Sequence, residues 1–203
     1  MSRLGFIFEC GREGPDFKVT KHLLARLDPQ LEMVPRFMDQ KKNLVSNCGP
    51  VAAELLRACE RVVIQWDLYP IFRSGPACRR KDKEKIRASL AANAVPAHRV
   101  VMVCVEEELE AWLLADRRAV ASLLERYKAP HPVGVIPEKK DPDHVSNPKT
   151  YLTRLFNREL GRNRRYEDRV HALALAEKIP DFSKIRRSAS FRHFALEVAG
   201  RTL

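Results

Sequence analysis

The segment "LGFIFECGREGPD", residues 4–16, begins as an apolar strand and stops at a carboxylate in a glycine-rich turn. Its apolar residues 6–8 are typical of a strand buried on both faces of a parallel sheet. Glu9 follows them directly, where an aliphatic residue would have continued the strand. Beyond the turn, apolar residues recur at helical spacing as far as Leu27, and Asp16 is the expected N-cap. The segment therefore predicts a strand, a turn and a helix, with an acid at the carboxyl end of the strand.

The same alternation of strand and helix continues to residue 127. Pro35 places the next strand at a sheet edge or a bulge. Strands are expected over residues 31–38, 61–67 and 98–106. Helices are expected over residues 49–59, 81–93 and 107–127. The first of these helices has a proline in its first turn, and the last is one helix or two joined near Asp116. Strands that alternate with helices predict an α/β fold with a mostly parallel sheet covered on both faces.

The character of the sequence changes after residue 127. Residues 128–149 are rich in proline and lack periodicity, which predicts a long loop or arm. Three helical segments follow, near residues 148–160, 165–178 and 188–200. We therefore expect an α/β domain over residues 1–127, with residues 128–203 forming a loop and a basic helical extension packed on it.

Composition excludes several classes of protein. At 45% hydrophobic and 31% charged residues, the 203-residue chain has the composition of a soluble globular protein. No apolar stretch approaches the roughly 20 residues that span a bilayer, so no membrane partner is expected. The N-terminus lacks the features of a secretory signal, which favours the cytoplasm. The five cysteines are scattered and form no C-x-x-C pair, as expected of reduced thiols.

The chain is strongly basic. It has 37 Lys and Arg residues against 26 Asp and Glu, a formal charge of +11, which favours polyanionic partners. Residues 161–203 hold ten basic and five acidic residues. Solubility alone is the alternative explanation, and the sequence leaves the two open. The candidate nucleic-acid contacts are Arg73, Lys149, Arg162, Arg164, Arg165, Arg186 and Arg187.

Three of the expected strands end in acids: Glu9, Asp67 and residues 106–108. Ligands of open parallel sheets bind beyond the carboxyl ends of the strands, so these acids are expected to converge. Carboxylates held together repel one another unless a cation joins them, and oxygen ligands suit Mg²⁺ or Mn²⁺. The alternative is that each acid is an exposed loop residue. For residues 106–108, stabilisation of the following helix N-terminus stays equally open.

The stretches "GFIFECGREGPD", "VVIQWD" and "ELEAWLLAD" together resemble an uncharacterised family of Toprim-like proteins, known mainly as a domain of unknown function. Toprim domains occur in topoisomerases, primases and nucleases, among them the OLD family. They hold magnesium with a glutamate after the first strand and an Asp-x-Asp after a later one. By this resemblance Glu9 matches the glutamate and Asp67 the first aspartate, which implies that both are catalytic metal ligands.

The sequence departs from the Toprim pattern at Tyr69, where a second acid is expected. Either Glu108 or Glu110 then supplies the missing metal ligand, and Glu108 is the nearer to the strand end. In this interpretation Glu9 serves as a metal ligand or a general base, and the metal activates water and stabilises charge on the phosphoryl oxygens.

Two functions follow from the resemblance. The first is a Mg²⁺- or Mn²⁺-dependent Toprim-like phosphoesterase, expected to be a nuclease acting on DNA rather than RNA, beside an ATPase partner protein in defence against phage or other foreign DNA. The second is a catalytically weakened module that binds nucleic acid or a protein partner. Whether the chain is an enzyme depends on whether the change at Tyr69 abolishes the metal site.

Overall fold

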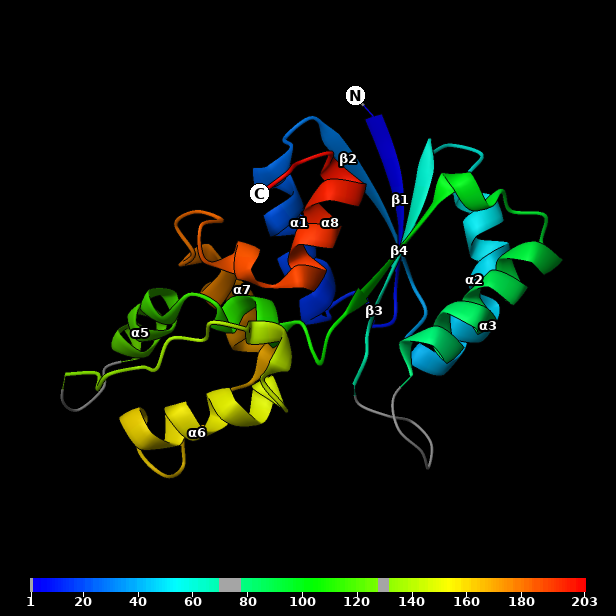
Figure 1. Ribbon diagram of the computed structural model, residues 1–203. Helices are drawn as coiled ribbons and strands as arrows, with labels where there is room; N and C mark the ends of the chain where they lie inside the picture. The colour runs from blue at the N-terminus through cyan, green and yellow to red at the C-terminus, as the bar shows by residue number, and fades with distance from the viewer. Residues whose placement is uncertain (1, 70–77, 128–131) are drawn as a thin grey trace.

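A computed structural model of the chain describes residues 2–69, 78–127 and 132–203. Its centre is a four-stranded sheet in which all neighbouring strands are parallel, in the order β2-β1-β3-β4 (Figure 1). The strands are β1 (Ser2–Phe8), β2 (Leu31–Phe37), β3 (Arg61–Asp67) and β4 (Val100–Val105). The predicted α/β class with a parallel sheet is confirmed.

Alternate residues of the central strands pack against different helix layers. Phe6 and Phe8 belong to the larger core, on the face of the sheet that α1 (Pro15–Leu27) covers. Ile7 belongs to a smaller core beneath α2 (Lys41–Leu55) and α3 (Arg79–Ala92). Figure 1 shows α2 and α3 on one side of the sheet and α1 with the C-terminal helix α8 (Ala189–Ala199) on the other. The sheet is therefore covered on both faces, as predicted.

Pro35 lies in the edge strand β2, as predicted, opposite Phe6 of β1. A proline is tolerated there because an edge strand forms ladder hydrogen bonds on one side only.

Two predicted helix starts are wrong. Helix α2 begins at Lys41 rather than at Gly49, so Pro50 lies inside it. The apolar stripe continues upstream of the proline at Leu44, and its burial outweighs the roughly 3 kcal/mol cost of an internal proline. The N-cap of α1 is Gly14, which leaves the predicted cap Asp16 in the first turn of the helix.

The segment after β4 forms two helices, one of the two arrangements expected. Helix α4 (Glu110–Leu114) is completely buried, and α5 (Arg117–Arg126) follows it. Asp116 separates them because its carboxylate caps α5, accepting hydrogen bonds from the backbone N–H groups of Arg118, at 2.9 Å, and Ala119, at 3.3 Å.

The C-terminal part packs against the sheet side that α1 covers. Residues 132–147 form an arm that is irregular except for a short 3-10 turn, η2 (Pro142–His144), and the predicted loop residues 128–131 lie outside the described part of the chain. Then come α6 (Pro148–Leu160), α7 (Asp168–Glu177), the turn η3 (Ile185–Arg187) and α8, close to the three predicted helices. Within the described residues, no helix has the length and apolar character needed to cross a membrane.

The arm and α8 are joined to α4 by a buried polar network. Trp112 of α4 packs its ring against Phe191 of α8, with centroids 5.2 Å apart. Its Nε1 donates a hydrogen bond to Ser190 Oγ at 2.7 Å. Ser190 in turn donates its backbone N–H to Asp143 Oδ2 of the arm at 2.9 Å. The segments that follow the sheet therefore share the core of the segments that form it.

Candidate functional site at the carboxyl ends of β1 and β3

The two central strands, β1 and β3, end at a topological switch point. From β1 the chain crosses to β2 on one side, and from β3 it crosses to β4 on the other. Such a switch point leaves a crevice beyond the strand ends, where ligands of open α/β sheets bind. Glu9 follows β1 directly and Asp67 is the last residue of β3. The structure therefore brings these two candidates into electrostatic contact beyond the strand ends.

Asp16 is a third acid at this point, although the sequence pattern predicted it only as the N-cap of the first helix. The turn between β1 and α1 is tight, with Gly14 N–H donating to Gly11 O at 2.8 Å. A Cβ on Gly14 would lie 2.5 Å from Cys10 Cβ, so only glycine fits. This turn starts α1 beside the crevice, and Asp16 is the strongest charged neighbour of both Glu9 and Asp67.

The segment between β4 and α4 adds two further carboxylates. Leu109 N–H donates to Asp67 Oδ2 at 3.4 Å, which ties this segment to the end of β3. Glu110 is fully buried, and its Oε1 accepts a hydrogen bond from the Tyr166 hydroxyl at 3.2 Å. Glu108 Oε2 accepts from the Lys149 backbone N–H at 3.2 Å.

The three consecutive glutamates after β4 have different partners. Glu106 pairs with Arg79 of α3. Glu107 Oε2 accepts from Asn147 N–H at 3.4 Å, so Glu107 and Glu108 both meet backbone donors at the N-terminal end of α6. Carboxylates at such a position are favourable because the first N–H groups of a helix have no partner within it. The helix-stabilising alternative thus holds for a different helix from the one expected.

Lys149 lies among these carboxylates. Its Nζ is 3.7 Å from Glu108 Oε1, 3.9 Å from Glu110 Oε2 and 3.3 Å from Asp168 Oδ2. The side chain is 35% exposed. Its contacts in the structure are with carboxylates, which the sequence analysis did not expect of a candidate phosphate contact.

We call six residues the acidic cluster: Glu9, Asp16, Asp67, Glu108, Glu110 and Asp168. Lys149 interacts with members of this cluster, in which six carboxyl groups outnumber the one ammonium group. Glu9 Oε2 and Glu110 Oε2 are buried and have no hydrogen-bond partner. Buried carboxylate oxygens without partners are costly when ionised, so the cluster has capacity for additional positive charge.

The pKa values of several carboxyl groups in the cluster are raised, as expected where buried acids outnumber the nearby cations. Burial and the nearby Asp16 raise the pKa of Glu9 to about 8. Burial raises the pKa of Glu110 to about 8, against the opposing effect of Lys149. Burial and the neighbouring carboxylates also raise the pKa of Asp67 well above its ordinary value. At neutral pH the cluster therefore retains protons that another cation would displace.

Lys41 holds the end of β3 from the other face of the sheet. Its Nζ donates to the carbonyl oxygens of Asp67, at 2.8 Å, and Leu68, at 2.7 Å, and pairs with Asp82 Oδ2 at 3.2 Å. The lysine is buried, with 8% of its surface exposed. It fixes the backbone that carries Asp67.

The donor chemistry of the acidic cluster fits a hard divalent cation, because carboxylate oxygens are the ligands such ions prefer. Among the described residues, however, no three His, Cys, Asp or Glu side chains are already gathered as a metal-binding group. Glu9 and Asp67 lie with Asp16 at the strand ends, whereas Glu108 turns toward Lys149. Asp16 is therefore a third acid beside Glu9 and Asp67.

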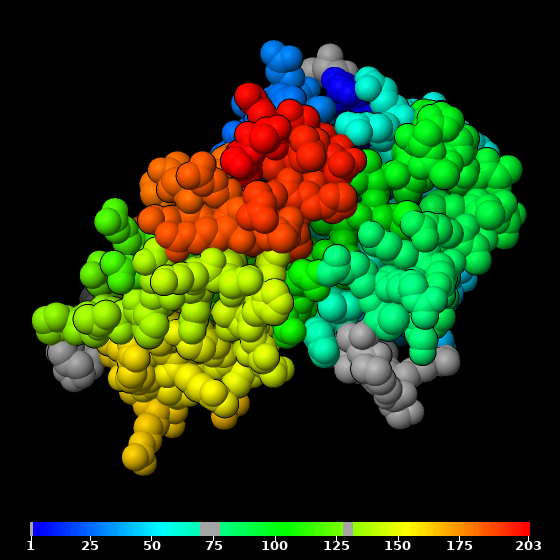
Figure 2. Space-filling model, viewed as in Figure 1, coloured from blue at the N-terminus to red at the C-terminus, as the bar shows by residue number. Residues whose placement is uncertain are grey.

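The remaining basic candidates lie elsewhere on the surface, apart from Arg73, which lies outside the described residues. Arg162, Arg164 and Arg165 are exposed in the turn between α6 and α7, which protrudes at one end of the molecule (Figure 2). Arg186 and Arg187 lie in η3, where Arg187 pairs with Glu138 of the arm.

The sequence signals for the other cluster members were weak. Glu110 was considered only as an alternative to Glu108. Asp168 and Tyr166 reach Lys149 and Glu110 because α6 and α7 fold back onto α4.

The chain matches a protein family described as "Domain of unknown function (DUF4276)" over residues 17–199. Neither a curated protein nor a solved structure matches the chain.

Proposed function

The chain belongs to this family of unknown function, DUF4276, and we propose from the geometry of its site that it is a divalent-cation-dependent phosphoesterase acting on nucleic acid. The observation that carries the proposal is the excess of buried, partly unpartnered carboxylates at the switch point of the sheet. Such a cluster is unfavourable in itself, and strained electrostatics of this kind are typical of functional sites.

Three residues are best placed to hold the cation: Glu9, Asp16 and Asp67, which come from β1, α1 and β3. When bound, Mg²⁺ or Mn²⁺ would supply Lewis-acid stabilisation of phosphoryl oxygens and a more acidic water. The resemblance to Toprim domains supports the same assignment for Glu9 and Asp67, and Asp16 takes the place of the acid that Tyr69 lacks.

The other residues of the site have supporting roles in this proposal. Lys149 offers a positive charge beside the carboxylates, where a phosphate oxygen of the substrate would sit. Lys41 keeps the end of β3, and therefore Asp67, in position through its two carbonyl contacts. Tyr166 orients Glu110 by donating a hydrogen bond to its Oε1.

Nucleic acid is the substrate class that the charge of the chain favours. The formal charge is +11, and the exposed arginines of the turn between α6 and α7 are free to meet a phosphate backbone. DNA is our first choice of substrate. On the same resemblance, we propose an ATPase partner and a role in defence against foreign DNA.

A second candidate function is a nucleic-acid-binding module without catalysis. The position of Lys149 favours it, because an ammonium group already neutralises part of the cluster on which the cation would depend. The two functions differ in one measurable property, since only the phosphoesterase requires a bound cation.

The experiment that tests the proposal measures cation binding and cleavage together. Mn²⁺ binding is followed by calorimetry, and cleavage of plasmid and single-stranded DNA is followed in Mg²⁺ and in Mn²⁺. Glu9→Gln and Asp16→Asn should each abolish both signals. Glu13→Gln is the matched control, because Glu13 lies in the same turn but is exposed and pairs with Lys18. Cleavage that persists in Glu9→Gln would eliminate the proposed site, and DNA binding without Mn²⁺ binding would favour the second function.

A further inference from the structure

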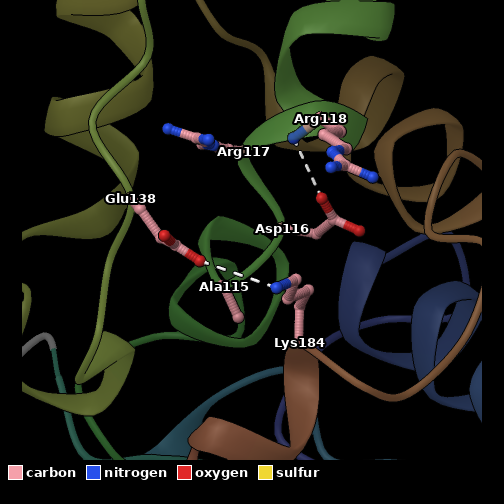
Figure 3. A pocket seen from close by; sticks show the side chains of 6 residues that line it. All are labelled: Ala115, Asp116, Arg117, Arg118, Glu138 and Lys184. Carbon is pink, nitrogen blue, oxygen red and sulfur yellow. Dashed lines mark hydrogen bonds and ion pairs between the residues drawn. The ribbon is translucent and has the colours of Figure 1, made fainter.

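A polar pocket lies at the junction of α4 and α5, outside the acidic cluster (Figure 3). Its volume is about 70 Å³, several times the roughly 10–15 Å³ that one water molecule needs. It is lined by Ala115, Asp116, Arg117, Arg118, Glu138 and Lys184. The size suits a single oxyanion such as phosphate.

The cations of the pocket are only partly neutralised. Among the described residues, no carboxylate lies within ion-pair distance of the Arg117 or Arg118 side chain. Both arginines are exposed. Figure 3 shows their side chains leaving the start of α5 on opposite sides, with Arg117 toward the arm that carries Glu138 and Arg118 beside Asp116. The Asp116 carboxylate is already engaged, because it caps α5 through the N–H of Arg118 at 2.9 Å. Two guanidinium groups are therefore available to an incoming anion.

Glu138 of the arm supplies the anion that the pocket now holds. Its Oε1 lies 2.5 Å from Arg187 Nη1 and 3.8 Å from Lys184 Nζ. Figure 3 shows Glu138 and Lys184 meeting across the pocket from different segments. The Lys184 contact is long, so it resists displacement less than the Arg187 contact does.

We infer that this pocket binds a phosphate group, which Arg117 and Arg118 contact while it displaces Glu138 from Lys184. Guanidinium groups favour phosphate because their planar N–H donors match pairs of its oxygens, and a lysine adds a point charge. Glu138 keeps Lys184 and Arg187 in place when the pocket holds no phosphate. This inference does not depend on the proposed phosphoesterase activity.

The test titrates the full chain with inorganic phosphate, followed by calorimetry in a sulfate-free buffer with a chelator present. Wild type should bind saturably. Arg118→Gln should weaken binding roughly tenfold, as the loss of one charge-assisted contact implies. Glu138→Gln should tighten binding, because it removes the competing negative charge, while the amide oxygen can still accept the hydrogen bond from Arg187. Arg126→Gln is the matched control, since it removes the same charge from the exposed last turn of α5 and should leave affinity unchanged.

The source of the phosphate is distinguished by a second arm with a short oligonucleotide that carries either a 5′-phosphate or a 5′-hydroxyl. If the protein prefers the 5′-phosphorylated strand and Arg118→Gln removes that preference, the pocket binds the ends of nucleic-acid strands. If the protein binds only inorganic phosphate, the pocket binds the free anion. The inference is wrong if wild type and Glu138→Gln bind neither probe, or if Arg118→Gln binds as tightly as wild type. An unchanged affinity in Glu138→Gln would overturn the displacement of Glu138. Glu9→Gln should bind phosphate as tightly as wild type does. Loss of phosphate binding in the pocket can therefore be distinguished from loss of cation binding in the acidic cluster.

Discussion

Glu9→Gln should make the cation-free protein more stable at alkaline pH, although it removes a residue on which the proposed activity depends. An ionised Glu9 is unfavourable in the folded chain because it is buried beside Asp16, whereas in the unfolded chain it is solvated. The folded state therefore binds a proton that the unfolded state releases. The contribution of protonated Glu9 to the free energy of unfolding is fully present below the ordinary pKa of 4.5 and is lost as the pH rises through about 8.

The magnitude follows from the pKa of Glu9, which rises from 4.5 to about 8. Each pH unit between these values costs the folded state about 1.4 kcal/mol, so the penalty at pH 8 approaches roughly 4 kcal/mol. Part of it is shared with Asp16 and Lys149, which interact with Glu9 directly. We expect Glu9→Gln to raise the free energy of unfolding by roughly 2–4 kcal/mol at pH 8 and by less than about 1 kcal/mol at pH 5.

The assay is urea unfolding with a chelator present at both pH values, followed by the fluorescence of the two buried tryptophans, Trp66 and Trp112. Glu13→Gln serves as the control, because the exposed pair of Glu13 with Lys18 should change stability little at either pH. A Glu9→Gln protein that gains no stability at pH 8, or gains equally at pH 5, would refute the electrostatic reasoning. Saturating Mn²⁺ should stabilise wild type and not the variant.

Three further changes probe the rest of the structure by urea unfolding. Lys149→Met removes the cation from the acidic cluster and should cost roughly 2 kcal/mol at pH 9, where Glu9 and Glu110 are ionised, but less at pH 6, where both hold protons; an equal loss at both pH values would contradict this. Trp112→Phe keeps a smaller aromatic ring and loses the 2.7 Å hydrogen bond to Ser190; beyond the cost of the lost ring volume, the lost bond should cost about 1–2 kcal/mol. That cost should not add to the cost of Ser190→Ala, and full additivity would count against the bond. Gly49→Ala would place a Cβ 2.1 Å from the carbonyl oxygen of Ser89 and separate α2 from α3, costing more than about 2 kcal/mol. Wild-type stability would show that the two helices pack less closely.

The strand ends were predictable from sequence because burial and chemistry leave a local signal there. An apolar run that stops at Glu9 or Asp67 indicates both the strand and the acid at its carboxyl end, and parallel topology then brings the two acids together. Pro50 gave a misleading signal, because a proline in the first turn of a helix is the common case and an internal proline is rare. Packing of the residues before it decided the outcome.

The other members of the acidic cluster left weaker signals because their positions depend on long-range packing. Asp16 lies in a first turn, where an acid is favourable for the helix itself, so its helical context masks its place beside Glu9. Asp168 and Lys149 are distant in sequence from the strands and reach the cluster only through the return of α6 and α7. No periodicity in a single sequence encodes that return.

The shared core of Trp112, Phe191 and α1 has a consequence for biosynthesis. While the ribosome is still adding the last helix, α1 and α4 have no cover for the apolar faces that α8 buries in the finished protein. We therefore expect the emerging N-terminal half to expose an apolar surface, and to be prone to aggregation, until α8 has left the exit tunnel. A fragment expressed only as far as residue 127 should accumulate in inclusion bodies, because it lacks α8, which covers part of the apolar core.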